Sequence, residues 1–172
     1  MPLWLDSVEQ IRLNHVLPYI KGKLLDIGCG YNNLVRLYGN GIGVDVYPWA
    51  NVQVLVGEET ELPFGNASFG TVAIIAALNH ITNRPKALRE VHRVLQDDGQ
   101  LIMTMINPLV GIVAHIIFTK DEKVRGGFKT GERKGLWDHE VKFLLDEAGF
   151  YIQEESTFEL RLNKIYVARK NR

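Results

Sequence analysis

The sequence predicts an α/β protein with a doubly wound, seven-stranded, mostly parallel sheet whose last strand is antiparallel, in three α/β/α layers. Seven apolar runs have the length of strands, and helical patterns separate most of them. The run within 68–77 is almost continuously apolar, which is typical of a strand covered on both faces. The final two runs are joined by only a few residues. A parallel crossover needs about a dozen, so the link favours an antiparallel hairpin.

Helices and strands are expected to alternate through the first half of the chain. The first helix is predicted over 6–20, where Ile11 and Leu13 lie among apolar residues on or near one face. A buried strand at 23–27 and a short helix at 32–38 follow. The next three strands are expected at 42–46, at 52–56 and within 68–77.

The second half continues the same pattern. Asn83 and Pro85 predict the start of a helix that runs to about Leu95. Gly149 closes a later helix. The expected elements are a strand at 100–106, a helix at 138–148 and a hairpin of strands at 151–158 and 161–169. Such an arrangement gives a mostly parallel sheet with helices on both faces.

The composition indicates one globular domain over residues 1–172, in which 107–137 is an irregular insertion. The 172 residues are enough for one real core, and the formal net charge is zero. A zero net charge gives no global attraction to nucleic acid. Cys29 is the single cysteine, so no internal disulfide is possible, and no Cys/His cluster of the metal-binding kind is visible.

The sequence also predicts a cytoplasmic protein. Asp6 and Glu9 interrupt the N-terminal segment, and no charged-then-apolar leader precedes them. The apolar run LVGIVAHIIF, residues 109–118, is about half as long as a bilayer span requires. A transmembrane segment is therefore not expected, although this run with the basic residues behind it leaves peripheral membrane contact open.

Two glycines and two aspartates indicate a nucleoside ligand. The run LLDIGCG, residues 24–30, ends a predicted strand in a glycine turn, and GVDV, residues 43–46, ends the next strand in Asp45. Glycines allow close approach of the backbone, and an acid at the second strand tip can accept bonds from ribose hydroxyls. A dinucleotide fingerprint would place glycine at Asn33, and Asp26 would repel a pyrophosphate. A ligand with an ammonium and a sulfonium suits Asp26 better.

At this point the chain resembles the class I S-adenosylmethionine-dependent methyltransferases, in particular the small methyltransferase-11-like domains. Five segments occur in the family's order, and together they span roughly half of the chain. They are LDIGCG at 25–30, GVDV at 43–46, ELPFGNASF at 61–69, ALNHI at 77–81 and LREVHRVLQDDGQLIM at 88–103. The resemblance implies a Rossmann-like fold, S-adenosyl-L-methionine as cofactor and S-adenosyl-L-homocysteine as product.

The resemblance also implies a role for each matching position. The turn, with Asp26, Gly28 and Gly30, would line the methionine portion of the cofactor. Asp45 would hold the ribose hydroxyls. The other implied positions are Val46 beside the adenine ring, Glu58 facing the adenine amino group, and Ile75 and Ala76 approaching the methionine end through their backbone. Glu58 is equally consistent with a solvated loop, and Asp26 and Asp45 with structural strand-end acids.

Two positions in the turn need separate interpretation. Cys29 belongs to the expected cofactor site. Its thiol is better explained as a small packing group than as a nucleophile. The family commonly has a third glycine at Asn32. Asparagine is the residue other than glycine that best adopts left-handed backbone geometry, so the turn is expected to survive.

His80 is the candidate catalytic base. It follows the fourth predicted strand, near the expected methyl acceptor, and an imidazole can take a proton at neutral pH. A purely structural histidine is the alternative, and Asn79 is a comparable polar candidate. The acceptor is expected to be a small or amphiphilic, lipid-like molecule, with 107–137 as lid or acceptor wall.

Two other functions remain open at this point. The chain could be a non-catalytic, cofactor-binding subunit with a methyltransferase-like fold. It could instead be an RNA or protein methyltransferase that uses the basic residues of 107–137. The few aromatic residues among those basic residues make a nucleic-acid partner the weaker interpretation.

Overall fold

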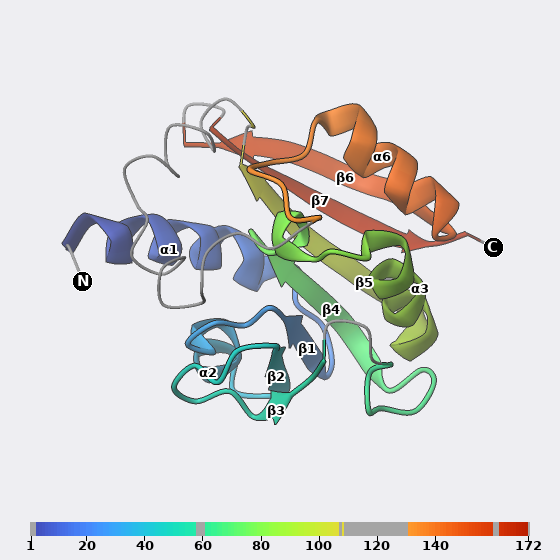
Figure 1. Ribbon diagram of the computed structural model, residues 1–172, viewed down its shortest axis with the longest axis horizontal. Helices are drawn as coiled ribbons and strands as arrows, with labels where there is room; N and C mark the ends of the chain where they lie inside the picture. The colour runs from blue at the N-terminus through green and yellow to red at the C-terminus, as the bar shows by residue number, and fades with distance from the viewer. Residues whose placement is uncertain (1–2, 58–60, 107, 109–130, 160–161, 172) are drawn as a thin grey trace.

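The sheet has seven strands in the order β3-β2-β1-β4-β5-β7-β6 (Figure 1). The computed structural model describes residues 3–57, 61–106, 108, 131–159 and 162–171, and side chains from residue 9 onward. All neighbouring strands pair in parallel except β7, which is antiparallel to both β5 and β6. The strands are β1 (Leu24–Ile27), β2 (Gly41–Asp45), β3 (Val54–Leu55), β4 (Phe69–Ile75), β5 (Leu95–Ile106), β6 (Phe150–Phe158) and β7 (Asn163–Lys170).

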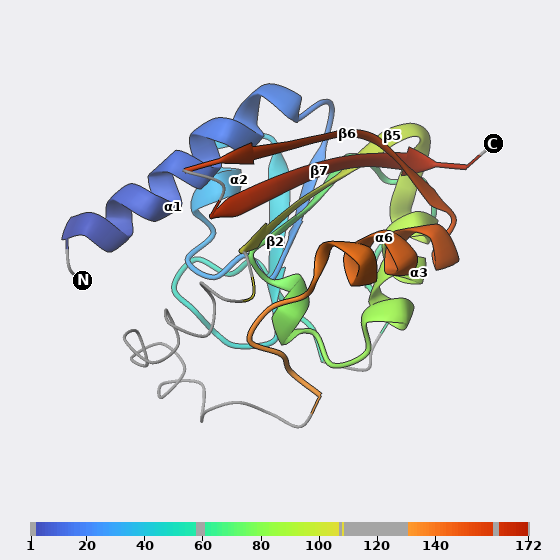
Figure 2. The same ribbon diagram turned by 90° about the horizontal axis from the view of Figure 1, so that it is seen from above.

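Helices cover both faces of this sheet, as the sequence predicted. Figure 2 shows α1 and α2 on one side and α3 and α6 on the other. The helices are α1 (Leu3–Val16), α2 (Asn33–Tyr38), α3 (Arg84–Val94) and α6 (Asp138–Glu147), with short 3₁₀ turns η1 (Leu17–Tyr19) and η2 (Leu78–His80). The predicted doubly wound fold with an antiparallel last strand is therefore confirmed.

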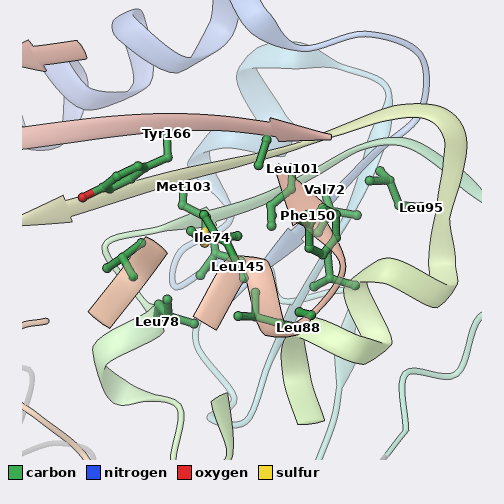
Figure 3. Close-up of a cluster of buried hydrophobic side chains, with 14 of the residues drawn as sticks. Val72, Ile74, Leu78, Leu88, Leu95, Leu101, Met103, Leu145, Phe150 and Tyr166 are labelled. Atoms are coloured by element: carbon green, nitrogen blue, oxygen red, sulfur yellow. The ribbon is translucent and has the colours of Figure 1, made fainter. Parts of the chain in front are cut away.

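The alternation of side chains along the strands builds two separate cores. Leu24 packs with Val16 of α1 and Leu34 of α2, whereas Leu25 belongs to the cluster under α3 and α6. Successive residues of a strand point to opposite faces, so one strand serves both layers. Figure 3 shows the larger cluster, in which Leu88 of α3 and Leu145 of α6 lie against the sheet.

Two strands differ from the sequence prediction. The strand expected over 52–56 is only two residues long as β3, and within the described residues no helix separates it from β2. Strand β5 begins at Leu95, earlier than the predicted 100. Leu95 pairs with Phe69 and Gln100 with Thr71, so four polar or small residues bulge from the ladder between them. That polar bulge conceals the strand's beginning in the sequence.

The order of the strands reverses direction between β1 and β4. The helix after β1, α2, covers one face, and the helix after β4, α3, covers the other. In such sheets ligands bind at the carboxyl ends of the strands where the connections diverge. The described residues include no helix that is both long and apolar enough to cross a membrane. The apolar run 109–118 lies outside the described residues.

Candidate active site

Asp26 and Asp45 lie on the same face of adjacent strands at the carboxyl end of the sheet. Asp26 is paired in register with Gly43, and Asp45 follows Gly43 by two positions. Leu24, two positions before Asp26, packs under α1 and α2, so both carboxylates lie on that face. Only 3 % of Asp26 and 8 % of Asp45 is exposed. The expected pair of acids is therefore brought together.

The carboxyl of Asp26 is buried without full hydrogen bonding. Its Oδ1 has no partner among the described residues. Burial, followed by the negative charges of Asp45 and Glu9, raises the pKa of Asp26 to about 7. Glu9 comes from α1 and also accepts a hydrogen bond from Asn33 Nδ2 at 3.0 Å. A buried oxygen that lacks a hydrogen-bond donor and lies near other acids favours a ligand that is cationic and donates hydrogen bonds.

Gly28 and Gly30 make the turn after β1 possible. Both have positive φ, +71° and +52°, and a Cβ on Gly28 would lie 2.6 Å from the Cβ of Ala77. A Cβ on Gly30 would meet nothing within 4 Å. The amides of Gly28 and Cys29 donate to the carbonyl of Val44 at 2.9 and 3.1 Å, which holds the turn on β2. Open space therefore lies beside Gly30, whereas Gly28 is closed against η2.

Asp45 is oriented by two backbone amides. Its Oδ2 accepts from the Gly30 N–H at 3.0 Å and its Oδ1 from the Tyr47 N–H at 2.9 Å. Each carboxylate oxygen retains capacity for a further donor. Val46 is 45 % exposed at this strand tip. Glu58, expected near the adenine amino group, lies outside the described residues.

Asn32 adopts the left-handed conformation expected of it, with φ 62° and ψ 31°. The structure also assigns its side chain a set of contacts that the sequence did not indicate. Asn32 Nδ2 donates to the carbonyl of Asn51 at 2.9 Å and to Gln53 Oε1 at 3.2 Å. Gln53 lies 21 residues from Asn32 in the chain, so no local pattern could have revealed this link.

The thiol of Cys29 is free and half-buried. Burial, with the charges of Asp26 and Asp45, raises the pKa of Cys29 to about 12. A thiol with so high a pKa is a poor nucleophile at neutral pH.

The end of β4 meets the glycine turn. Ala76 has φ 50°, and its amide donates to the carbonyl of Thr104 at 3.0 Å and to its hydroxyl at 3.1 Å. This positive φ is unusual for alanine and turns the chain sharply after Ile75. Ala77 then contacts Gly28. Ile75 is the last residue of β4, Ala76 follows it, and both are half-buried.

His80 is paired with an acid that the sequence analysis missed. His80 Nδ1 lies 3.2 Å from Glu132 Oε2, and the Glu132 side chain is only 4 % exposed. The backbone beside this pair is joined to η2. Asn79 and Arg133 exchange two hydrogen bonds, with Asn79 O accepting at 2.9 Å and Asn79 Nδ2 donating at 3.1 Å. Both the backbone carbonyl and the side-chain amide of Asn79 are therefore engaged in this junction. The 52-residue separation of His80 and Glu132 hides their pairing in the sequence.

Arg84 reinforces the same junction. Its guanidinium donates to the carbonyls of Leu78, Asn79 and Gly131 at 3.1, 2.9 and 2.9 Å. The described residues 131–133 therefore lie against η2 directly after β4.

Residues 25–103 match the model of a methyltransferase domain. The chain is 37 % identical over 123 residues to an uncharacterized protein, MJ1252, of Methanocaldococcus jannaschii, covering 65 % of this chain and 48 % of that protein. It is 25 % identical over 159 residues to the mitochondrial arginine-hydroxylase NDUFAF5 of Rattus norvegicus, covering 81 % and 45 %. The chain thus spans about half the length of these curated relatives.

The fold has close structural counterparts. A solved chain from the complex between the Haloferax volcanii Trm112 methyltransferase activator and a methyltransferase aligns with a TM-score of 0.72. It shares 14 % sequence identity, over 97 % of this chain and 93 % of that one. The strand order and the reversed β7 are those of a class I methyltransferase-like fold, and within it residues 25–103 are similar to a methyltransferase domain.

Proposed function

We propose that the chain binds S-adenosylmethionine and transfers its methyl group to a small or amphiphilic acceptor. The observation that supports this most directly is the buried, unpartnered Oδ1 of Asp26 beside Asp45 and Glu9. A ligand with an ammonium and a sulfonium matches the charge of this cluster. Among the described residues, no group of three or more His, Cys, Asp or Glu side chains could hold a metal ion.

The surrounding residues also fit this cofactor. The open space beside Gly30 allows a ligand to approach the backbone. In this proposal Asp26 and the turn from Gly28 to Gly30, including Cys29, receive the methionine portion. Asp45 receives the ribose hydroxyls and Val46 lies beside the adenine. When bound, the cofactor supplies an electrophilic methyl group that any well-placed nucleophile can take.

The described residues beyond β4 serve the acceptor in this proposal. Ile75 and Ala76 shape the wall next to the transferred methyl group. His80 takes the proton of a hydroxyl acceptor, and Glu132 orients the imidazole through its Nδ1. Placing an acceptor in line with the methyl group contributes up to about 7–11 kcal/mol in favourable cases.

The proposal is tested by calorimetric titration of S-adenosylmethionine and S-adenosylhomocysteine into the purified chain. Binding of either ligand is the expected result, and the absence of binding of both at millimolar concentration contradicts the proposal. Asp45→Ala removes bonds to a charged acceptor, each worth about 1.5–3 kcal/mol, so affinity should fall at least tenfold. Asp98→Ala, an exposed acid on the β5 bulge, is the matched control and should leave affinity unchanged.

A second candidate is a cofactor-binding subunit without methyl transfer of its own. It is favoured by two comparisons: one relative is named a hydroxylase, and one structural counterpart was solved with a methyltransferase activator. Release of S-adenosylhomocysteine, measured with a panel of phenol, quinol, amine and carboxylate acceptors, separates the two. Tight cofactor binding with no release by any acceptor, and recovery of release with a co-purified partner, would favour the subunit.

A further inference from the structure

We propose that Asn32 and Gln53 form a polar staple that positions Asp45 for the cofactor ribose, where the staple means the contact of Asn32 Nδ2 with Asn51 O and Gln53 Oε1. The inference rests on the proposed function. It adds two positioning residues, neither of which touches the cofactor.

The staple joins two segments that α2 and β2 separate in the sequence. The first segment is the glycine turn, 28–32, and the second is the connection from β2 to β3, 46–53. Gln53 Oε1 accepts from Asn32 Nδ2 at 3.2 Å and from the Gly43 N–H at 2.7 Å, and Gln53 N–H donates to Gly43 O at 3.2 Å. One amide side chain thus links the turn, the connection and β2.

The hydrogen-bond partners of the Asn32 side chain fix the orientation of its amide. Its Nδ2 faces two acceptors, Asn51 O and Gln53 Oε1, and a flipped amide would place oxygen against both. The Oδ1 lies over Gly43, where a Cβ would approach it to 2.0 Å. The absence of a side chain at Gly43 is what makes room for this amide.

Asp45 is held between the segments that the staple joins. Its Oδ2 accepts from Gly30 N–H, which belongs to the turn, and its Oδ1 from Tyr47 N–H, which belongs to the connection. The Gly30 amide reaches the carboxylate only while the turn keeps its position beside β2, whereas the Tyr47 amide is two residues from Asp45 and binds it locally. Cutting the staple leaves the turn attached to β2 through Gly28 and Cys29 alone, and so weakens the orientation of the carboxylate without changing any group that would contact the ligand.

A glycine at position 32 would satisfy the left-handed backbone without the amide. The side chain is instead buried, 3 % exposed, with an Oδ1 that lacks a partner among the described residues. The left-handed backbone alone does not explain why a buried amide side chain occupies position 32. The two hydrogen bonds of Asn32 Nδ2 do explain it.

The test is calorimetric binding of S-adenosylhomocysteine, and of its 2′,3′-dideoxy analogue, to the wild-type chain and to Asn32→Gly. The variant keeps the left-handed turn and removes only the staple. We expect about a tenfold or greater loss of affinity for S-adenosylhomocysteine and less than about a twofold change for the analogue, which lacks the hydroxyls that Asp45 would bind.

Ala67→Gly is the matched control. Ala67 is also left-handed, with φ 51°, is exposed, and lies in the turn before β4, outside the staple. It should bind both ligands like the wild type. Gln53→Leu should reproduce Asn32→Gly, whereas Gln53→Glu keeps an acceptor and should restore most of the affinity.

Two outcomes would overturn the staple: unchanged affinity of Asn32→Gly for S-adenosylhomocysteine, or equal losses for the two ligands. If the wild-type chain binds neither S-adenosylmethionine nor S-adenosylhomocysteine, it is the proposed function that fails. Thermal unfolding of each variant shows that the loss of affinity is not a loss of fold.

Discussion

Asp26 and Asp45 share one face of adjacent strands, and the charge of Asp45 adds to burial in raising the pKa of Asp26. The two acids therefore oppose each other in the protein without ligand. A cation between them would relieve that repulsion, which couples cofactor binding to the charge state of the site.

Asp26→Asn should stabilise the chain without ligand. The pKa of Asp26 is about 7 in the folded state against 3.8 for an exposed Asp. A raised acid pKa means that the unfolded chain loses its proton first. The wild type therefore loses stability as pH rises from about 4 to 7, and this loss is complete above pH 7. The difference corresponds to no more than about 4 kcal/mol.

We expect the melting temperature of Asp26→Asn to exceed that of the wild type by a few degrees at pH 8 and by little at pH 4. Scanning calorimetry at both pH values checks this. Asp98→Asn serves as the exposed control. A variant that melts below the wild type at pH 8 would show that the carboxylate is stabilising.

Cofactor binding should release protons near pH 6. At that pH much of Asp26 is protonated, because burial raises its pKa to about 7, and a cationic ligand binds the ionised form. Titration of S-adenosylmethionine in phosphate and in imidazole buffer reports the protons released from the difference in heat. We expect release at pH 6 and almost none at pH 8.5. Equal release at both pH values would assign the proton to another group.

Alanine at Gly28 and at Gly30 should have different consequences. Both positions have positive φ, but a Cβ at Gly28 would collide with Ala77 and one at Gly30 would project into open space. Gly28→Ala is expected to cost a few kcal/mol of stability, and Gly30→Ala about 1 kcal/mol. Gly30→Ala should nevertheless lose cofactor affinity at least tenfold, because the added methyl occupies the ligand's approach.

Denaturant unfolding and calorimetric binding of the same two variants measure these effects. Equal stability of the two variants would contradict the crowding at Gly28. Full affinity of Gly30→Ala would show that the cofactor does not approach the turn at that point.

Tyr166→Phe should destabilise the chain without affecting the cofactor. Tyr166 is 2 % exposed in the cluster of Figure 3, and its hydroxyl donates to Asp138 Oδ1 at 2.7 Å at the start of α6. Loss of a hydrogen bond to a charged acceptor costs about 1.5–3 kcal/mol, and the lower end applies here because the Asp138 side chain is half-exposed. Tyr151→Phe, on the half-exposed edge strand, should cost much less. Urea unfolding measures the stability of both variants. If Tyr166→Phe is as stable as Tyr151→Phe, the hydroxyl of Tyr166 does not stabilise the start of α6.

The sequence predicts the parts of the site that depend on local chemistry. Gly28 and Asp26 follow from a strand that ends in a turn, and the left-handed conformation of Asn32 follows from the properties of its side chain. Gln53 and Glu132 could not be predicted, because their contacts depend on how distant segments meet. The start of β5 was missed because a polar bulge interrupts its hydrophobic pattern.

The two outer strands differ in how they discourage association of one sheet with another. Strand β3 has two residues and offers little backbone for an incoming strand. Strand β6 is long, but Glu154 and Glu155 stand exposed along it, and Glu155 is engaged by Lys142 and Lys164. The short length of β3 and the charged side chains of β6 both oppose edge-to-edge aggregation of sheets. The protein should therefore tolerate the high concentrations that calorimetry and crystallisation require.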